Sequence, residues 1–141
     1  MSKVAVVYWS GTGNTEMMAQ KVAEGAKEAG AEVSVLTCAD FSADDVDAYD
    51  AIAFGCPAMG DEELEDGEFE PFFSDLEGKL SGKKVALFGS YDWGDGEWMR
   101  TWCGRAKDAG AELVEDEGLI VNNTPDDEGL AACRELGGKL A

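Results

Sequence analysis

The residues best suited to chemistry lie in a short loop near the N-terminus, which reads SGTGNT at positions 10–15. Gly11 and Gly13 permit unusual backbone dihedrals and let a ligand approach the backbone closely. If a helix begins here, the amides of this loop, with those of Asn14 and Thr15, face an anion at the positive end of the helix dipole. Hydroxyl donors are added by Ser10, Thr12 and Thr15. The loop therefore predicts a phosphate cradle, and a glycine-rich turn with a Thr or Asn cap stays open as the other interpretation.

Two common nucleotide cradles do not fit this loop. A Walker loop requires a lysine after its last glycine, and the segment contains none. A dinucleotide fingerprint requires a third glycine at position 16, where this chain has Glu16. A phosphate would therefore be held by neutral donors alone, which suits a terminal monoester that is bound and not hydrolysed.

The elements that must position this loop alternate along the chain. Runs rich in β-formers predict strands at 3–9, 31–37, 51–56, 83–90 and 111–121, the last one interrupted. Apolar spacings of three and four residues predict helices at 15–29, 69–80, 97–109 and 127–140. Glycines at or near the ends of three of these helices act as stop signals: Gly30, Gly82 and Gly110.

Strands that alternate with helices indicate crossover connections and a parallel sheet. The continuous apolar runs VAVV, AIAF and VALF indicate strands covered on both faces. The expectation is an α/β fold, a three-layer α/β/α sandwich, formed by residues 1–141 as a single domain. In such sheets a ligand binds beyond the carboxyl ends of the strands. The loops to inspect are therefore 10–15, 57–67, 90–97 and 122–126.

The excess of acidic residues limits the kinds of macromolecule that the chain can bind. Asp and Glu outnumber Lys and Arg by 30 to 11, a formal net charge of -19. Nucleic acids and anionic membranes repel such a chain, whereas a basic protein surface attracts it. Acidity that serves only solubility, or that reflects a salty habitat, is the alternative.

The cysteines and the N-terminal residues indicate whether the chain binds a metal ion and where in the cell it is found. The four cysteines form no C-x-x-C pair, and the chain has no histidine, so we expect no metal site and reduced thiols in the cytoplasm. The N-terminus does not resemble a signal peptide, and no segment approaches the roughly 18 apolar residues of a membrane span. Monomer is the expected state, from the short chain and its self-repulsion.

Three segments in order resemble one family. SGTGNT resembles the S/T-x-T-G-x-T phosphate loop of flavodoxins. GCPAMGDEELEDGEFEPF, residues 55–72, resembles the second flavin loop of the short-chain, clostridial-like type. KKVALFGSYDWGDGEWMR, residues 83–100, resembles the third, and the likeness runs end to end, including LIVNNTPD at 119–126.

The resemblance implies a flavodoxin-like fold, with a five-stranded, doubly wound parallel sheet in the order 2-1-3-4-5. It implies a low-potential one-electron carrier that binds FMN non-covalently, shuttles between semiquinone and hydroquinone, and is not an enzyme. The residues that it implies for cofactor binding come from three loops: Ser10, Gly11, Thr12, Gly13, Asn14 and Thr15; Pro57, Ala58, Met59, Gly60, Asp61 and Glu62; Ser90, Tyr91, Asp92, Trp93 and Gly94.

Individual roles also follow from the resemblance. Trp93 is expected to stack on the outer face of the flavin ring and Met59 to pack near its inner face. The Gly60–Asp61 peptide is expected to flip when the flavin gains an electron and a proton, so that a carbonyl accepts from N(5)-H and stabilises the neutral semiquinone. Glycine makes both orientations of that peptide sterically cheap. Glu62 is expected to accept from N(3)-H of the ring.

The acidic residues near the second loop, Asp92 and Cys56 each lead to a further expectation. Acidic residues at 61–66, with no cation in the three loops, should raise the energy of the anionic, fully reduced flavin and so make the second reduction difficult. Their solvated members should serve docking to a basic partner. Asp92 stands where the clostridial type usually has Gly. Its carboxylate either faces the flavin and lowers the reduction potential of the flavin, or it points to solvent. It could also alter the backbone, since Asp enters positive φ less easily than Gly. Cys56 is interpreted as a small core residue, with a redox thiol as the alternative.

Competing functions are separable. An FMN-dependent reductase of quinones or nitro compounds would need a nicotinamide site, and the sequence shows no basic cluster for one. A receiver-type signalling domain would need acidic residues after the first strand and a lysine after the fifth, and neither is present. A non-flavin interaction module would leave the purified protein colourless. The physiological partners expected by resemblance are ferredoxin-using oxidoreductases.

Overall fold

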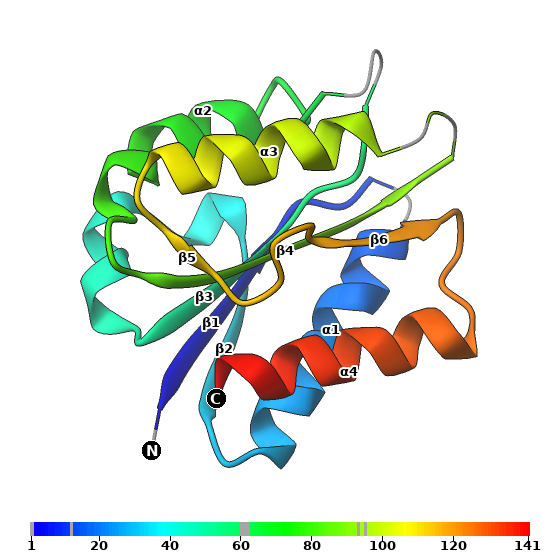
Figure 1. The fold of residues 1–141 in the computed structure, drawn as a ribbon, viewed down its shortest axis with the longest axis horizontal. Helices are drawn as coiled ribbons and strands as arrows, with labels where there is room; N and C mark the ends of the chain where they lie inside the picture. Colours follow the sequence, from blue (N-terminus) through cyan, green and yellow to red (C-terminus); the bar gives the residue numbers. More distant parts are fainter. Residues whose placement is uncertain (1, 12, 60–62, 93, 95) are drawn as a thin grey trace.

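A parallel sheet runs through the middle of the molecule in the computed structural model, which describes residues 2–11, 13–59, 63–92, 94 and 96–141 (Figure 1). Its strands are β1 (Lys3–Tyr8), β2 (Glu32–Thr37), β3 (Ala51–Gly55), β4 (Lys84–Tyr91), β5 (Glu112–Leu113) and β6 (Leu119–Asn122). The order is β2-β1-β3-β4-β5, and β6 also pairs with β4. All pairings are parallel. The predicted strand order is confirmed.

The predicted fifth strand, 111–121, is interrupted, as the sequence indicated. β5 pairs with Lys84 and Val85 at the start of β4, and β6 pairs with Phe88–Tyr91 at its end. Residues 114–118 lie between the two pieces and include Gly118, whose φ of 71° suits glycine. The same edge of β4 is thus completed by two short strands, so the described sheet has six strands rather than five.

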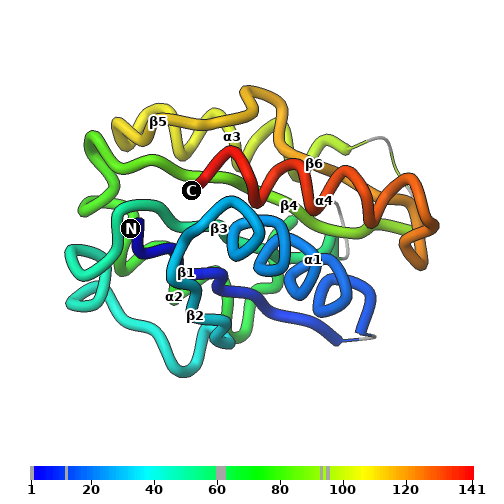
Figure 2. Tube along the Cα trace, turned by 90° about the horizontal axis from the view of Figure 1, so that it is seen from below, coloured from blue at the N-terminus to red at the C-terminus, as the bar shows by residue number. Residues whose placement is uncertain are grey.

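Two helices cover each face of the sheet. α1 (Asn14–Glu28) and α4 (Asp127–Leu140) lie side by side on one face, the face seen in Figure 2, and α2 (Phe69–Leu76) and α3 (Glu97–Asp108) lie on the other. The four predicted helices are therefore present. Short 3₁₀ helices occur at Cys38–Asp40, Ala43–Ala48 and Glu77–Lys79. The three-layer α/β/α architecture is as expected.

The side chains of β3 divide by size between the two faces of the sheet. Ile52 and Phe54 point toward α2 and α3, whereas Ala51 and Ala53 point toward α1 and α4. Successive side chains of a strand face opposite sides, so the large and small residues are separated completely. The layer formed by α1 and α4 thus packs over the small residues of β3.

Glycines bring α1 and α4 into backbone contact. A Cβ added at Gly25 would lie 1.9 Å from the carbonyl oxygen of Arg134, and one added at Gly137 would lie 1.9 Å from that of Val22. Real Cβ atoms do not approach an oxygen so closely, so neither site tolerates a larger residue without moving a helix. The packing of α4 on α1 fixes the helix that begins at the first loop.

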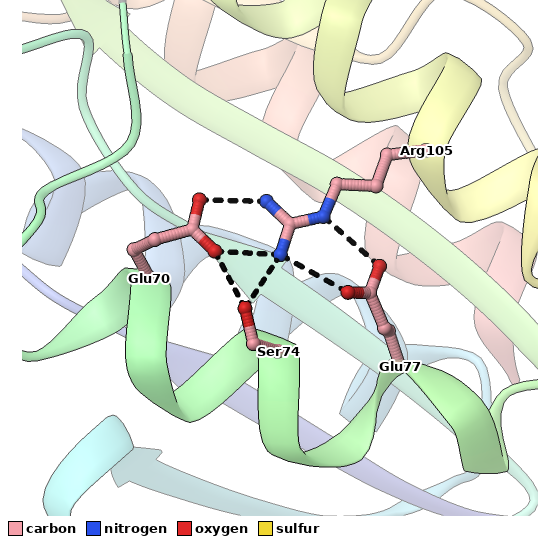
Figure 3. Close-up of polar contacts among 4 residues, drawn as sticks. All are labelled: Glu70, Ser74, Glu77 and Arg105. Carbon is pink, nitrogen blue, oxygen red and sulfur yellow. Dashed lines mark hydrogen bonds and ion pairs between the residues drawn. The ribbon is translucent and has the colours of Figure 1, made fainter.

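An arginine joins α2 to α3 on the other face (Figure 3). Nη1 and Nη2 of Arg105 donate to the two carboxylate oxygens of Glu70 at 2.7 and 2.6 Å, and Nε donates to Glu77 at 2.9 Å. Nη2 also donates to Oγ of Ser74, which donates to Glu70. The hydrogen bonds from Arg105 hold the pKa of Glu70 below its ordinary value, and those to Glu70 raise the pKa of Arg105. Both therefore stay charged across the neutral range.

Candidate functional site

A cavity of about 360 Å³ lies at the carboxyl ends of the central strands. Its described lining comes from all four loops that the sequence singled out and from the residue after β1: Trp9, Gly11, Asn14, Pro57, Ala58, Met59, Ser90, Tyr91, Asp92, Asn123 and Thr124. Parallel strands present their carboxyl ends at one edge of the sheet, and this is why loops far apart in the chain meet there.

The first loop ends in a left-handed glycine that starts α1. Gly13, at φ 95°, is the N-cap of the helix, and Oγ of Ser10 accepts from the amides of Gly13 at 3.1 Å and Glu16 at 3.3 Å. The sequence predicted that the Gly13 amide would face an anion; the structure turns it toward Ser10 instead. Within the part of the chain that is described, the amides of Asn14 and Thr15 have no intramolecular acceptor, as expected for the first turn of a helix. These two amides are the donors left for an anion.

Thr15 connects the first loop to the third. Its side chain is buried, and its hydroxyl lies 3.2 Å from that of Ser90, which is also buried at the end of β4. Either hydroxyl can donate in this pair. Ser90 is among the described residues that line the cavity, so the Thr15 hydroxyl contacts a residue of the cavity wall.

The second loop is held at its base by backbone hydrogen bonds. The amide of Ala58 donates to the carbonyl of Ser90 at 3.0 Å. Met59 and Glu63 exchange two hydrogen bonds, of 2.8 and 3.0 Å, in an antiparallel bridge. Pro57 and Ala58 are half-buried, and the side chain of Met59 is 39% exposed. The predictions for Thr12, Gly60, Asp61, Glu62 and Trp93 concern residues outside those described.

One member of the acidic run is structural. The carboxylate of Glu65 accepts from the amides of Gly67 at 2.8 Å, Glu68 at 2.7 Å and Phe69 at 2.9 Å, where α2 begins. Its partial burial acts to raise its pKa, but the three amides outweigh that effect and hold the pKa below its ordinary value. Glu65 is therefore not one of the solvated acidic residues expected to serve docking, because a helix start needs acceptors for its unpaired amides.

The third loop carries Tyr91, Asp92 and Gly94. Tyr91 is half-buried, with its ring 5.6 Å from the buried ring of Trp98, and Asp92 and Gly94 are exposed. Gly94 has a φ of 89°. Among the described non-glycine residues, the left-handed region holds Asn123 alone, so Asp92 does not adopt a positive φ. The expectation that Asp92 alters the loop backbone stays a prediction.

Three residues of the lining were missed as site residues: Trp9, Asn123 and Thr124. The amide of Asn123 donates to the carbonyl of Tyr91 at 2.6 Å, which ties the 122–124 turn to the third loop. The Trp9 ring lies 3.1 Å from where a Cβ on Gly11 would stand. A large aromatic directly after the first strand, and an Asn-Asn pair after the last one, were the available signals.

The cysteines are packing residues. All four are buried free thiols, and no group of three potential metal ligands occurs among the described residues. Burial raises the pKa of Cys38 to about 11 and of Cys133 to about 12, and it raises the pKa of Cys56 and Cys103. The interpretation of Cys56 as a core residue is confirmed by its complete burial. In the described part of the chain, no helix is long and apolar enough to cross a membrane.

Comparison with known proteins gives consistent results. A sequence model of the family described as Flavodoxin matches residues 6–137. A flavodoxin from Megasphaera elsdenii is 54% identical over 134 residues, covering 95% of each chain. One from Clostridium beijerinckii is 51% identical over 136 residues, covering 96% of this chain and 97% of that protein. The solution structure of two-electron reduced Megasphaera elsdenii flavodoxin has a TM-score of 0.89 at 52% identity and covers 97% of both chains.

Proposed function

The chain belongs to the flavodoxin family, in its short-chain, clostridial-like type, and from this premise we propose how its residues serve an FMN-based electron carrier. It is an electron-transfer protein rather than an enzyme, and its cofactor is FMN. The flavin supplies the redox chemistry when bound. The protein binds it, orients it, shields it from water and limits which partners reach it.

The phosphate is held by neutral donors at the start of α1. The observation that carries this assignment is the pair of amides at Asn14 and Thr15, which are directed out of the first turn without an intramolecular acceptor among the described residues. The helix dipole adds favourable partial charge at that point. Ser10 and Thr12 supply hydroxyls, and Ser10 keeps Gly13 in its left-handed conformation by accepting from its amide.

The second and third loops would hold the flavin ring between them. The described lining there is largely apolar, from Trp9, Met59 and Tyr91, which suits a planar aromatic group. Trp93 would stack on the outer face of the ring, and Glu62 would accept from its pyrimidine edge. The Gly60–Asp61 peptide would supply a hydrogen-bond acceptor to the ring, at a position where glycine makes either peptide orientation sterically accessible. The Met59–Glu63 bridge joins the two limbs of the second loop at its base.

Charge around the cavity favours a low potential. Its described lining includes Asp92 and no Lys or Arg, and Glu63, which bridges to Met59, is exposed. Added negative charge on a cofactor in this position is opposed by these carboxylates, because like charges repel and the site is only partly screened by water. Asp92 therefore lowers the potential of the final one-electron reduction.

The acidic rim meets a basic partner surface. Exposed carboxylates in and near the second and third loops include Glu63, Asp66, Glu68 and Asp92, on a chain with a net charge of -19. Complementary fields speed encounter without demanding tight binding, as a carrier requires. The chain works as a single-domain monomer in the cytoplasm, between ferredoxin-using oxidoreductases. Electron-transfer rates should fall steeply as salt rises, and a flat dependence in stopped-flow measurements contradicts electrostatic docking.

No observation favours the alternative, an FMN-dependent reductase of quinones or nitro compounds. An anaerobic reductive titration of the FMN-loaded protein distinguishes the two. A carrier accumulates a long-wavelength band from the one-electron-reduced flavin before full reduction. A direct passage from oxidised to fully reduced flavin contradicts the one-electron role, and a purified protein that binds no FMN contradicts the whole assignment.

A further inference from the structure

The backbone of Cys56 is fixed from two sides at the end of β3. Its amide donates to the carbonyl of Phe88 in β4 at 3.1 Å, and its carbonyl accepts from Nε1 of the buried Trp98 in α3 at 3.2 Å. A Cβ on Gly89 would lie 2.1 Å from that carbonyl oxygen, so β4 approaches closely here. Cys56 is therefore a rigid point directly below the second loop.

The sulfur of Cys56 contacts both limbs of that loop. Sγ donates to the carbonyl of Pro57, where the loop leaves the sheet, at 3.6 Å. Sγ also accepts from the amide of Glu65, where the loop returns, at 3.4 Å. A thiol can donate one hydrogen bond and accept another, and an aliphatic side chain of the same size can do neither.

The return limb is held at several described points, and the carbonyl of Glu65 also accepts from the amide of Glu70 at 2.8 Å. Glu63 is held by its bridge to Met59, and Glu65 by its hydrogen bond to Cys56. Between them, Leu64 is 7% exposed and packs in the core. The carboxylate of Glu65 in turn caps α2. The Cys56 sulfur thus connects the rigid end of β3 to the point where the loop becomes a helix.

We infer that Cys56 is a positioning residue for the cofactor: its sulfur fixes Glu65, and thereby Glu63, the bridge partner of Met59, and the placement of residues 57–59 at the cavity. This inference rests on the proposed FMN site. Burial keeps the thiol protonated, since it raises its pKa, so the donated hydrogen bond persists through the physiological range. Cys56 itself is not among the described residues that line the cavity.

Cys133 provides a matched control. It is also a fully buried free thiol, but it packs on the other side of the sheet, in the core beneath α1 and α4. Replacing either cysteine by alanine removes the same atoms from a core. A role limited to overall stability predicts comparable losses of stability for both changes, whereas a positioning role predicts effects at the second loop for Cys56 alone.

The test compares FMN-loaded wild type, Cys56→Ala and Cys133→Ala. Amide hydrogen exchange followed by NMR should show the amides of Glu63 and Glu65 exchanging at least about threefold faster in Cys56→Ala, relative to core amides. The Kd for FMN, from flavin fluorescence on dilution, should rise about three- to tenfold, the effect of losing one hydrogen bond. Cys133→Ala should change neither quantity.

Equal exchange rates and equal Kd values in the two variants overturn the inference. If Cys56→Ala does not fold, Cys56→Val fills a similar volume without hydrogen bonding and gives the same two readouts. The failure of the proposed function is distinct, since it appears as a wild-type protein that binds no FMN, while the exchange comparison still reports on the contact between Cys56 and Glu65.

Discussion

Two adjacent glycines of α4 should respond to the same substitution in opposite directions. Gly137 and Gly138 both lie in the last turns of the helix, so replacing either by alanine brings a similar gain in helix propensity, at most about 1 kcal/mol. Their surroundings differ. A Cβ at Gly137 would lie 1.9 Å from the carbonyl oxygen of Val22, whereas one at Gly138 finds its nearest neighbour, the carbonyl oxygen of Gly25, at 4.0 Å.

The contact at Gly137 cannot be relieved by a side-chain rotation, because both partners are backbone. α4 must move away from α1 by more than 1 Å to restore an ordinary contact, and overpacking of this kind costs about 1–3 kcal/mol. We expect the upper part of that range for Gly137→Ala, so that its net destabilisation is about 2 kcal/mol. Gly138→Ala should be stabilised by about 0.5–1 kcal/mol. The two variants then differ by about 3 kcal/mol, or roughly 10 °C in Tm for a chain of this length.

Thermal unfolding of the FMN-loaded proteins, followed by far-UV circular dichroism at one fixed excess of FMN, measures this difference. The excess must be fixed because ligand binding raises the apparent stability of the folded state. Equal Tm values for the two variants, or a lower Tm for Gly138→Ala, would refute the argument that the α1–α4 packing depends on backbone contact at Gly137.

Three further results are expected. Trp98→Phe should lower the free energy of unfolding by about 1–2 kcal/mol, because it removes a hydrogen bond to a backbone carbonyl. Trp102→Phe should lower it less, since Nε1 of Trp102 has no partner among the described residues. Equal losses in urea unfolding contradict this. Thr15→Val should raise the Kd for FMN severalfold in fluorescence titrations, because the hydroxyl of Ser90, which lines the cavity, loses its hydrogen-bond partner. An unchanged Kd contradicts this prediction. The folded-state pKa of Glu70 is depressed, so its pairing with Arg105 stabilises the protein above the unfolded-state pKa near 4.5 and is lost as pH falls below it. Arg105→Gln should therefore flatten the acid limb of stability against pH, and a limb as steep as in wild type counts against the pairing.

Local patterns were sufficient for the elements and for the place of the site. The apolar runs of β1, β3 and β4 are continuous because both faces of a central strand are buried, and this alone indicated a parallel sheet between two helical layers. Gly30, Gly82 and Gly110 have φ values of 100°, 75° and 89°, which few other residues adopt, so their positions in the sequence marked the ends of elements reliably. The cavity lies at the four predicted loops because the topology of a parallel sheet leaves one edge for a ligand.

Contacts between distant segments were decided only by the folded chain. Whether Glu65 is a solvated carboxylate or a helix cap depends on where the amides of Gly67–Phe69 point, and no local pattern states this. The Gly13 amide looked available for an anion until Ser10 was seen to accept from it. Trp9 and Asn123 joined the site because their segments end at the same edge of the sheet.

The sequence by itself determined the period of each element, its start and stop, and the chemistry of the three loops, because these depend on neighbouring residues and on backbone sterics. The tertiary structure decided which hydrogen-bond donors remain for a ligand and which glycines are indispensable. Gly25 and Gly137 read as ordinary helix glycines, and their importance arises from a partner helix that packs within van der Waals distance of their Cα atoms. Such requirements come from the close packing of the interior, which joins residues far apart in the chain.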